Sequence, residues 1–396
     1  MAQSSTHDGV TEDEAALYDR QIRLWGLEAQ GKIRTSHILV INLDGLTTEA
    51  IKNWVLAGIK RLTLIDFRDH TQWNDLSAGF FWREEDVGES SDRLTPAAAR
   101  IQALNPLVKI DILPSSSLQN LLNPTSSLLA DLNPSVLVVG IPSGQQSLSS
   151  QWSKDSLITL NNRSRQLGIP FYISGSQGLN GYIFSDLGDS HQYVIEKPDV
   201  NAALPASTVE GAALGAKAFP AEQQNSIPPP QVTVASSSKR LEKIKQEFVP
   251  LQKALEKSWK GLPRAQLRRQ KPSLGYFGVL ALWQLSGDGK VPSTEELASI
   301  CKSLIEERGL DLKTLLVSED DFSAFIDALV VSLSQPGEFS PTCAMVGGVL
   351  SQDVLNAIGG REAPLVNWFQ LEGLTGSGQI HALSTPQSVI VPPTGI

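Results

Sequence analysis

Residues 40–49, VINLDGLTTE, lie where a strand is followed by a helix, a place where many α/β proteins bind nucleotide phosphates. Such loops read G-x-G-x-x-G, because glycines permit a tight turn and let backbone amides approach the phosphates. The three glycine positions fall on Asn42, Asp44 and Thr47, and only Gly45 remains. A carboxylate at Asp44 would also oppose an anion. We therefore expect this loop to bind no nucleotide cofactor.

Asp66 ends the next apolar run, where a dinucleotide-binding protein carries the acid that contacts the ribose. Because the glycine loop is missing, a structural or solvated role is favoured over ribose binding. The sequence thus keeps the position of this acid without the loop that would hold the nucleotide.

The chain has two cysteines, Cys301 and Cys343, which cannot form a zinc site alone or a disulfide framework. Cys301 lies in a helical stretch of mixed charge, and Cys343 lies in an apolar helix with no candidate base nearby in sequence. We predict that both are buried or inert thiols. A reducing intracellular compartment fits this cysteine usage best.

The elements that would position these residues begin with a strand–helix–strand unit. HILVIN at 37–42 and RLTLID at 61–66 are apolar runs of strand length, and the segment between them has helical spacing. Thr47 or Thr48 is predicted to cap that helix, and Gly58 to end it. A unit of about 30 residues of this kind implies a parallel sheet.

Helices and strands continue to alternate along the chain. Before the first strand, Thr11 and Glu14 have the spacing of a capping box at a helix start. After the second strand, we predict a helix at 95–106, a strand at 136–140, a helix at 157–168, a strand at 170–175 and an antiparallel strand at 181–187. The fold class is α/β, with a mostly parallel sheet flanked by helices.

The composition changes near residue 200, where Ala, Pro, Ser and Gln become frequent. Helical spacing returns at 240–262 and in two later stretches, and an apolar helix at 340–360 precedes a hairpin at 368–383. We divide the chain into a Rossmann-like domain at 1–199, a flexible linker at 200–240, a helical insertion at 241–335, and a C-terminal helix and hairpin at 336–396 that complete the first domain.

The chain has 396 residues, 41% of them hydrophobic, and a net charge of −9. This length allows two domains with a large core. No apolar run approaches the roughly 20 residues that cross a membrane, and we expect no secretory signal and no membrane partner. The negative charge argues against nucleic acid as a partner. One basic run, KRLEKIK at 239–245, is interpreted as a charged helix face rather than as a nuclear signal.

Five segments point to one protein family. They are LYDRQIRLWGLEAQGKIRTSHILVIN at 17–42, LTTEAIKNWVLAGIKRLTLID at 46–66, RIQALNPLVKI at 100–110, PFYISGSQGLNGYIFSDLG at 170–188 and SPTCAMVGGVLSQDVLNAI at 340–358. These segments resemble the ubiquitin-like-protein activating enzymes, and the first two are similar to the start of those enzymes. YDRQIRLWG is a specific motif. The likeness spans nearly the whole chain apart from the linker, and it is closest to the small, non-cysteine subunits of the SUMO-activating heterodimers.

The resemblance implies a Rossmann-like, ThiF- or adenylation-type fold and accounts for the missing glycines. In this family a subunit with an intact loop pairs with a pseudo-symmetric partner that has lost it. ATP and magnesium would then bind to the cysteine-bearing partner, which adenylates the C-terminal glycine of a SUMO-like modifier and captures it as a thioester. The family's phosphate-contacting arginine falls near Ser77 or Ala78 here, and its thioester cysteine and CxxC pairs are absent.

The resemblance also assigns a role to one arginine. In the family, the arginine of YDRQ comes from the inactive half and reaches the ATP site of the other half, and Arg20 holds that position. A guanidinium is permanently charged and can bind two phosphate oxygens at once. From the residues alone, Arg20 and Arg23 would instead pair with Asp19 or Glu28 on a helix surface. The role of Arg23 stays open.

The sequence leaves alternatives. The corresponding subunit for NEDD8 has a similar N-terminal motif, but it usually carries a much longer insertion. A self-sufficient homodimeric adenylyltransferase of the bacterial thiamine or molybdopterin type would need the glycine loop, and so would a nicotinamide dehydrogenase. Location in the nucleus, and also in the cytoplasm, is expected from the resemblance.

Overall fold

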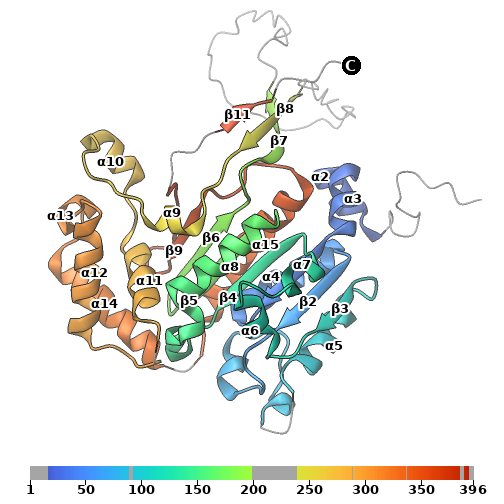
Figure 1. Ribbon diagram of the computed structural model, residues 1–396, viewed down its shortest axis with the longest axis horizontal. Coiled ribbons are helices and arrows are strands. Elements are labelled where there is room, and N and C mark those ends of the chain that lie inside the picture. Colours follow the sequence, from blue (N-terminus) through green and yellow to red (C-terminus); the bar gives the residue numbers. More distant parts are fainter. Residues whose placement is uncertain are drawn as a thin grey trace, which may run out of the picture.

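The computed structural model describes residues 17–88, 92–198, 239–287, 289–335, 337–383 and 388–391. Its centre is an eight-stranded sheet in the order β10-β9-β6-β5-β4-β1-β2-β3 (Figure 1). The parallel strands are β1 (His37–Ile41), β2 (Arg61–Ile65), β3 (Lys109–Ile112), β4 (Val136–Ile141) and β5 (Phe171–Gln177). The antiparallel strands are β6 (Asn180–Asp186), β9 (Trp368–Glu372) and β10 (Ser377–His381). The predicted α/β class is confirmed.

The predicted strand–helix–strand unit is formed by β1, α4 (Gly45–Ala57) and β2. Gly58 ends α4 with a φ of 83°, a left-handed conformation that favours glycine. The predicted cap is wrong: Asp44, not Thr47 or Thr48, is the N-cap of α4. Its carboxylate accepts the backbone N–H of Thr47, and the Thr47 hydroxyl accepts the backbone N–H of Asp44 in return. Thr47 is therefore the third helical residue of a capping box rather than the cap itself.

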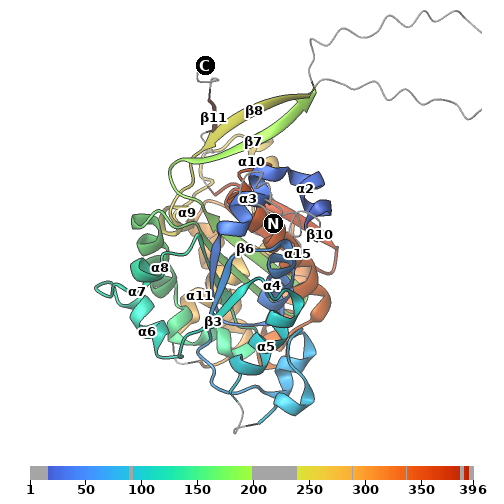
Figure 2. The same cartoon turned by 90° about the vertical axis from the view of Figure 1, so that its right-hand side faces the viewer.

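Two apolar layers cover the two faces of the sheet, because successive strand residues point to opposite sides. Ile38 and Val40 face one layer, and Leu39 and Ile41 face the other. The first layer contains α3 (Leu27–Thr35), α4, α5 (Leu94–Leu104) and α15 (Ser340–Gly359) (Figure 2). The second layer contains α6 (Ser117–Leu122), α7 (Leu128–Leu132), α8 (Lys154–Gln166) and part of the insertion. The helices predicted near 95–106, 157–168 and 340–360 are thus confirmed.

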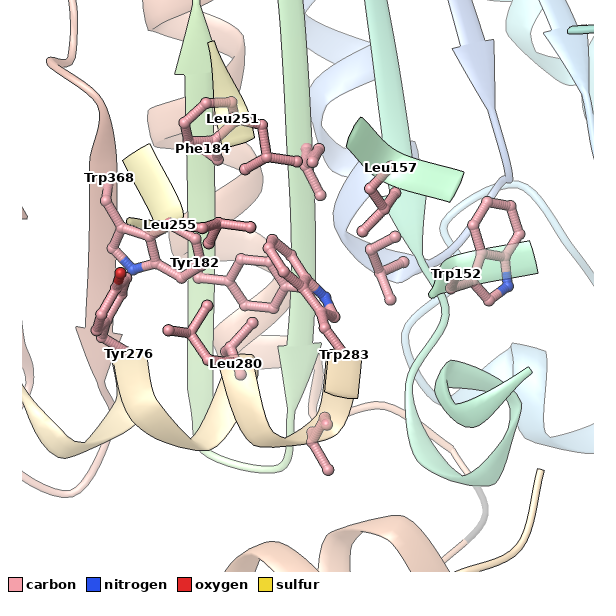
Figure 3. Close-up of a cluster of buried hydrophobic side chains, with 14 of the residues drawn as sticks. Trp152, Leu157, Tyr182, Phe184, Leu251, Leu255, Tyr276, Leu280, Trp283 and Trp368 are labelled. Atoms are coloured by element: carbon pink, nitrogen blue, oxygen red, sulfur yellow. The ribbon is translucent and has the colours of Figure 1, made fainter. Parts of the chain in front are cut away.

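The helical insertion shares its core with the sheet. Its helices are α9 (Leu251–Leu255), α10 (Arg264–Gln270), α11 (Leu274–Leu285), α12 (Thr294–Glu307), α13 (Leu312–Leu315) and α14 (Glu319–Ser334). Figure 3 shows Tyr276, Leu280 and Trp283 of α11 lying against Tyr182 and Trp368 of the sheet. The ring centre of Trp283 is 5.9 Å from that of Tyr182 and 5.7 Å from that of Trp368. Because these aromatic contacts join the two parts, the insertion packs as one layer of the same domain.

A second, three-stranded antiparallel sheet corrects one prediction. It consists of β7 (His191–Pro198), β8 (Lys239–Gln246) and β11 (Ser388–Ile390), and it reaches away from the body (Figure 2). The helix predicted from residue 240 is wrong in its first part, and KRLEKIK lies in a strand rather than on a helix face. The physical reason is long-range pairing, which places β8 between two partners and overrides its helical spacing.

Some predictions fall outside the described residues. These are the capping box at Thr11 and Glu14 and nearly all of the linker at 200–240. Before the sheet, the structure describes α2 (Asp19–Trp25), which leads directly into α3. The hairpin predicted at 368–383 is confirmed as β9 and β10. In the described ranges, no helix has the length and apolar character needed to cross a membrane.

Candidate functional site

The loop after β1 is closed by its own side chains. Asn42 has a φ of 69°, so it adopts the left-handed conformation for which asparagine is the next choice after glycine. Its side-chain amide is buried and donates to the carbonyl of Gly140 on β4, at 2.6 Å. A side chain therefore fills the first position at which a nucleotide loop has glycine.

Asp44 and Thr47 fill the other two positions. Both side chains are buried, and an oxygen of each serves the capping box at the start of α4. Asp44 Oδ2 packs toward Gly140, where an added Cβ would lie only 2.7 Å from it. The loop thus binds itself to β4 and leaves no open backbone cradle for a phosphate.

The N-terminus of α4 already holds an anion. The backbone N–H of Gly45 donates to Glu338 Oε2 at 2.5 Å, and the Ser176 hydroxyl donates to the other carboxylate oxygen at 3.3 Å. Glu338 lies just before α15, nearly 300 residues away in sequence. A helix N-terminus attracts negative charge and is the usual place of a bound phosphate in α/β proteins. Here a carboxylate of the same chain takes that place.

The electrostatics of this carboxyl pair differ from the expectation for Asp44. Burial, together with the charge of Glu338, raises the pKa of Asp44 to about 8. Burial also raises the pKa of Glu338. Asp44 is therefore mostly protonated at neutral pH, and the expected repulsion of an anion by Asp44 is not what closes the loop. Occupation of the α4 N-terminus by Glu338 closes it.

Asp66 has the structural role that the sequence favours. It is buried, and its carboxylate binds Arg68 Nε at 3.0 Å and Arg93 Nε at 3.1 Å. Burial acts to raise the pKa of Asp66, but the two guanidinium groups hold it below its ordinary value. Asp75 pairs with both arginines as well, and each arginine also donates to the carbonyl of Leu43. This cluster ties the loop to the segment after β2.

The position of the family's phosphate-contacting arginine is occupied by small side chains. The Ser77 hydroxyl accepts the backbone N–H of Glu338 at 2.9 Å. The methyl of Ala78 lies so close to Gly45 that a Cβ on this glycine would come within 2.5 Å of it. Gly45 is thus kept for close packing and not for phosphate binding.

A cavity of about 230 Å³ remains beside Glu338. Its lining includes the carboxyl groups of Asp44, Asp75 and Glu338, and its one basic side chain, Arg68, is already paired with Asp66. Such a lining is unsuited to a triphosphate, which needs free cationic or amide donors. Within the described ranges, no group of three or more His, Cys, Asp or Glu side chains is arranged to hold a metal ion.

Arg20 lies on α2, and its surroundings differ from those of the closed loop. It is exposed, and its guanidinium has no ion pair or hydrogen bond with the described part of the chain. Arg23 pairs with Asp19 at 3.0 Å, and Glu28 pairs with Lys32 at 2.9 Å. The neighbours that could have paired with Arg20 on the helix surface are therefore engaged elsewhere.

Both cysteines are buried, as predicted. Burial raises the pKa of the Cys301 thiol to about 12. Burial, with the charges of Glu338 and Asp44, raises the pKa of the Cys343 thiol far above its usual value. Neither sulfur is available as a thiolate at neutral pH, so neither can carry a thioester.

Sequence reasoning missed several residues of the closed site. Glu338, Arg68, Arg93 and Asp75 were not singled out, because each meets the loop through the tertiary structure. Arg68 and Asp75 lie a few residues beyond Asp66, and this cluster of charges directly after a buried strand was the one available signal. Glu338 has no local signal at all.

Comparisons with known proteins agree with the sequence and the fold. The model of the ThiF family matches residues 18–389. SUMO-activating enzyme subunit 1 of Xenopus laevis is 31% identical over 384 residues, which cover 95% of this chain and 97% of that protein. SUMO-activating enzyme subunit 1 of Rattus norvegicus is 30% identical, and the match covers 94% of this chain and 95% of that protein. SUMO-activating enzyme subunit 1 of Homo sapiens is also 30% identical, and the match covers 95% of this chain and 96% of that protein.

Proposed function

The chain belongs to the ThiF family, and we propose that it is the regulatory, non-cysteine subunit of a heterodimeric SUMO-activating enzyme. The observation that carries the proposal is the closed loop, in which Glu338 takes the phosphate position on Gly45. Its similarity to SUMO-activating enzyme subunit 1 over nearly its full length supports the choice of modifier.

In this proposal the partner subunit binds ATP and magnesium and adenylates the C-terminal glycine of the SUMO-like modifier. The partner's own cysteine then captures the modifier as a thioester. This chain binds no cofactor, and its two buried thiols take no part in the transfer. It contributes the dimer surface and one cation.

That cation is Arg20. Its guanidinium is exposed and has no partner among the described residues, so it is ready to bind two phosphate oxygens of ATP held by another subunit. Neutralising those oxygens assists adenylation, which builds up charge around the reacting phosphorus. Arg20 would thus act in trans, while Arg23 stays paired with Asp19.

An apolar face beside Arg20 supports a dimer interface there. Leu24 is 76% exposed, Leu17 58%, Met345 46% and Leu56 45%. These residues come from the α2 region, α4 and α15, and a hollow of about 330 Å³ lies between the same elements. Leu56 lines this hollow, and exposed apolar side chains beside a hollow are typical of a surface that another protein covers.

Nuclear location, with some protein in the cytoplasm, belongs to the same proposal and rests on the resemblance. KRLEKIK gives it little support, because the whole run is paired with β7, and its last two residues pair with β11 as well. A nuclear localisation signal would have to lie elsewhere in the heterodimer, or KRLEKIK would have to separate from its partner strands before an import receptor binds it.

The test is ATP–pyrophosphate exchange in the presence of a SUMO-like modifier. The chain alone is expected to show no exchange and no ATP binding, because its α4 N-terminus is occupied. Exchange should appear when the cysteine-bearing partner is added. Tight ATP binding and exchange by the isolated chain would contradict the proposal and support a self-sufficient adenylyltransferase.

A further inference from the structure

Positive charge is concentrated in one part of this acidic protein. Between residues 239 and 271 the sequence has eleven lysines and arginines against three glutamates, although the whole chain has a net charge of −9. Outside these 33 positions the chain is therefore even more acidic than its net charge suggests. Such segregation produces a local positive potential within a negative field.

Six of these side chains lie on and around α9 and α10, and we call them the basic ridge: Lys253, Lys257, Lys260, Arg264, Arg268 and Arg269. Five are exposed and Lys257 is partly exposed. None of the six forms an ion pair with a described residue, and the one acid between Lys253 and Arg269 is Glu256. Two other arginines differ, because Arg61 pairs with Asp111 and Arg100 pairs with Asp86.

The packing of α10 does not require this charge. No residue of α10 is buried, and only the partly buried Leu267 packs against the core. Figure 1 shows α10 at the outer margin of the insertion, away from the sheet. Arg264 and Arg268 are four positions apart, and like charges at that spacing destabilise a helix. Repulsion between these two arginines therefore lowers the stability of α10 unless a ligand neutralises their charge.

We propose that the basic ridge binds a short acidic polypeptide segment, rich in aspartate and glutamate, of a partner protein. Guanidinium groups match carboxylates in geometry, and three of the six cations are arginines. The inference goes beyond the proposed function, because it assigns a second docking surface that is separate from α2 and its neighbours.

A peptide fits the ridge better than a nucleic acid. Trp259, the aromatic residue within the ridge, is 1% exposed, so the ridge presents no ring on which bases could stack. A long phosphodiester backbone would also extend beyond the ridge over the acidic remainder of the protein. A short acidic segment stays within about one Debye length, roughly 8 Å at physiological salt, of the cations.

The experiment is fluorescence anisotropy with the full-length chain and a labelled decapeptide of alternating glutamate and serine. The matched probe has glutamine in place of glutamate. The acidic peptide should bind at 50 mM salt and weaken strongly at 300 mM, whereas the neutral peptide should not bind. The triple variant Arg264→Gln, Arg268→Gln, Arg269→Gln is expected to bind the acidic peptide about tenfold more weakly, because it removes three exposed charge contacts.

The control variant removes the same charge from exposed positions elsewhere: Lys60→Gln, Lys109→Gln and Lys154→Gln. It should bind like the wild type, with thermal unfolding showing that both variants are folded. An equal loss in the control, or no binding of the acidic peptide at low salt, would overturn the proposal. Displacement of the peptide by a ten-nucleotide single strand at lower concentration would overturn it in favour of nucleic acid.

Discussion

The loop after β1 and helix α2 place their candidate functional residues in opposite environments. In the loop, Asn42, Asp44 and Thr47 are buried and bonded to their own protein. In α2, no residue is buried and Arg20 has no partner among the described residues. The loop residues are thus part of the core, whereas the guanidinium of Arg20 stays available for the role in trans that we propose for it.

The closed loop also shows how a binding site is replaced. Glu338 takes the place of a phosphate on α4, and Arg68 and Arg93, which could have bound one, pair with Asp66 and Asp75. Every charge that a nucleotide would have balanced has a partner within the protein. We therefore expect substitutions in this region to change stability, and the substitution of Arg20 on α2 to change the rate of adenylation.

The largest effect should come from Arg93, the most buried charge of the closed region. Its side chain is 0% exposed, pairs with Asp66 and stacks on Trp82 at 3.9 Å. Arg93→Ala removes one of the two guanidinium groups that neutralise Asp66 and Asp75 and leaves a cavity beside Trp82, so it is expected to lower the free energy of unfolding by about 3–5 kcal/mol. Urea unfolding at pH 7 measures this. A loss below about 1 kcal/mol would show that the cluster is not structural.

A smaller effect, on rate rather than stability, is expected for Arg20. Arg20→Ala should leave the heterodimer intact and slow adenylation by roughly 30- to 1000-fold, which corresponds to about 2–4 kcal/mol. Arg20→Lys should restore only part of the rate, because an ammonium cannot bind two oxygens in the same way. Single-turnover adenylate formation measures the rate, and gel filtration measures dimer integrity.

Arg23→Ala is the matched control on the same helix. It removes only the exposed pair with Asp19, and its expected cost is below about 1 kcal/mol of stability, with no change in adenylation. A normal rate in Arg20→Ala, or an equal slowing in Arg23→Ala, would remove the contrast between the two regions and reduce α2 to a scaffold.

The smallest effect concerns the pH dependence of the loop. The pKa of Asp44 is about 8 in the folded protein, because of burial and the charge of Glu338, and near 4 in the unfolded chain. The folded state therefore holds the extra proton between these values, and Asp44 lowers stability as the pH rises through that window. Asp44→Asn keeps an N-cap oxygen but cannot ionise. Its free energy of unfolding is therefore expected to rise by about 1 kcal/mol or more, relative to that of the wild type, between pH 5 and pH 8.

Asp311→Asn is the control for this titration. Asp311 is the exposed N-cap of α13, and hydrogen bonds from Thr314 lower its pKa. Its contribution is already complete above pH 5, so the stability difference from the wild type should stay constant between pH 5 and pH 8. Parallel curves for Asp44→Asn as well would show that Asp44 is ionised in the folded state.

The sequence was sufficient where local pattern and tertiary structure agree. The strands at β1 and β2, the stop at Gly58 and the structural role of Asp66 follow from apolar runs, turn chemistry and the missing glycines. It failed at β8, where Leu241 and Ile244 have helical spacing with Phe248, which lies just beyond the strand. Pairing with β7 fixes this segment as a strand, although Leu241 remains 57% exposed.

The closed site was only half predictable for a similar reason. The degenerate loop is visible in Asn42, Asp44 and Thr47 alone. The carboxylate that fills it comes from Glu338, and no property of residues near 338 points to the loop. The left-handed conformation of Asn42 could have been inferred, since asparagine tolerates it better than other non-glycine residues do.

The late addition of β9 and α15 has a consequence for synthesis on the ribosome. Gln370 on β9 donates to Gly181 on β6 across 189 positions, and α15 covers α4, which was made still earlier. At 5–20 residues per second, roughly 10 to 40 s pass before β6 meets β9. Throughout that time the nascent chain has an open sheet edge and an uncovered apolar helix. Its vulnerability to aggregation therefore depends on the speed of translation and not only on the stability of the finished fold.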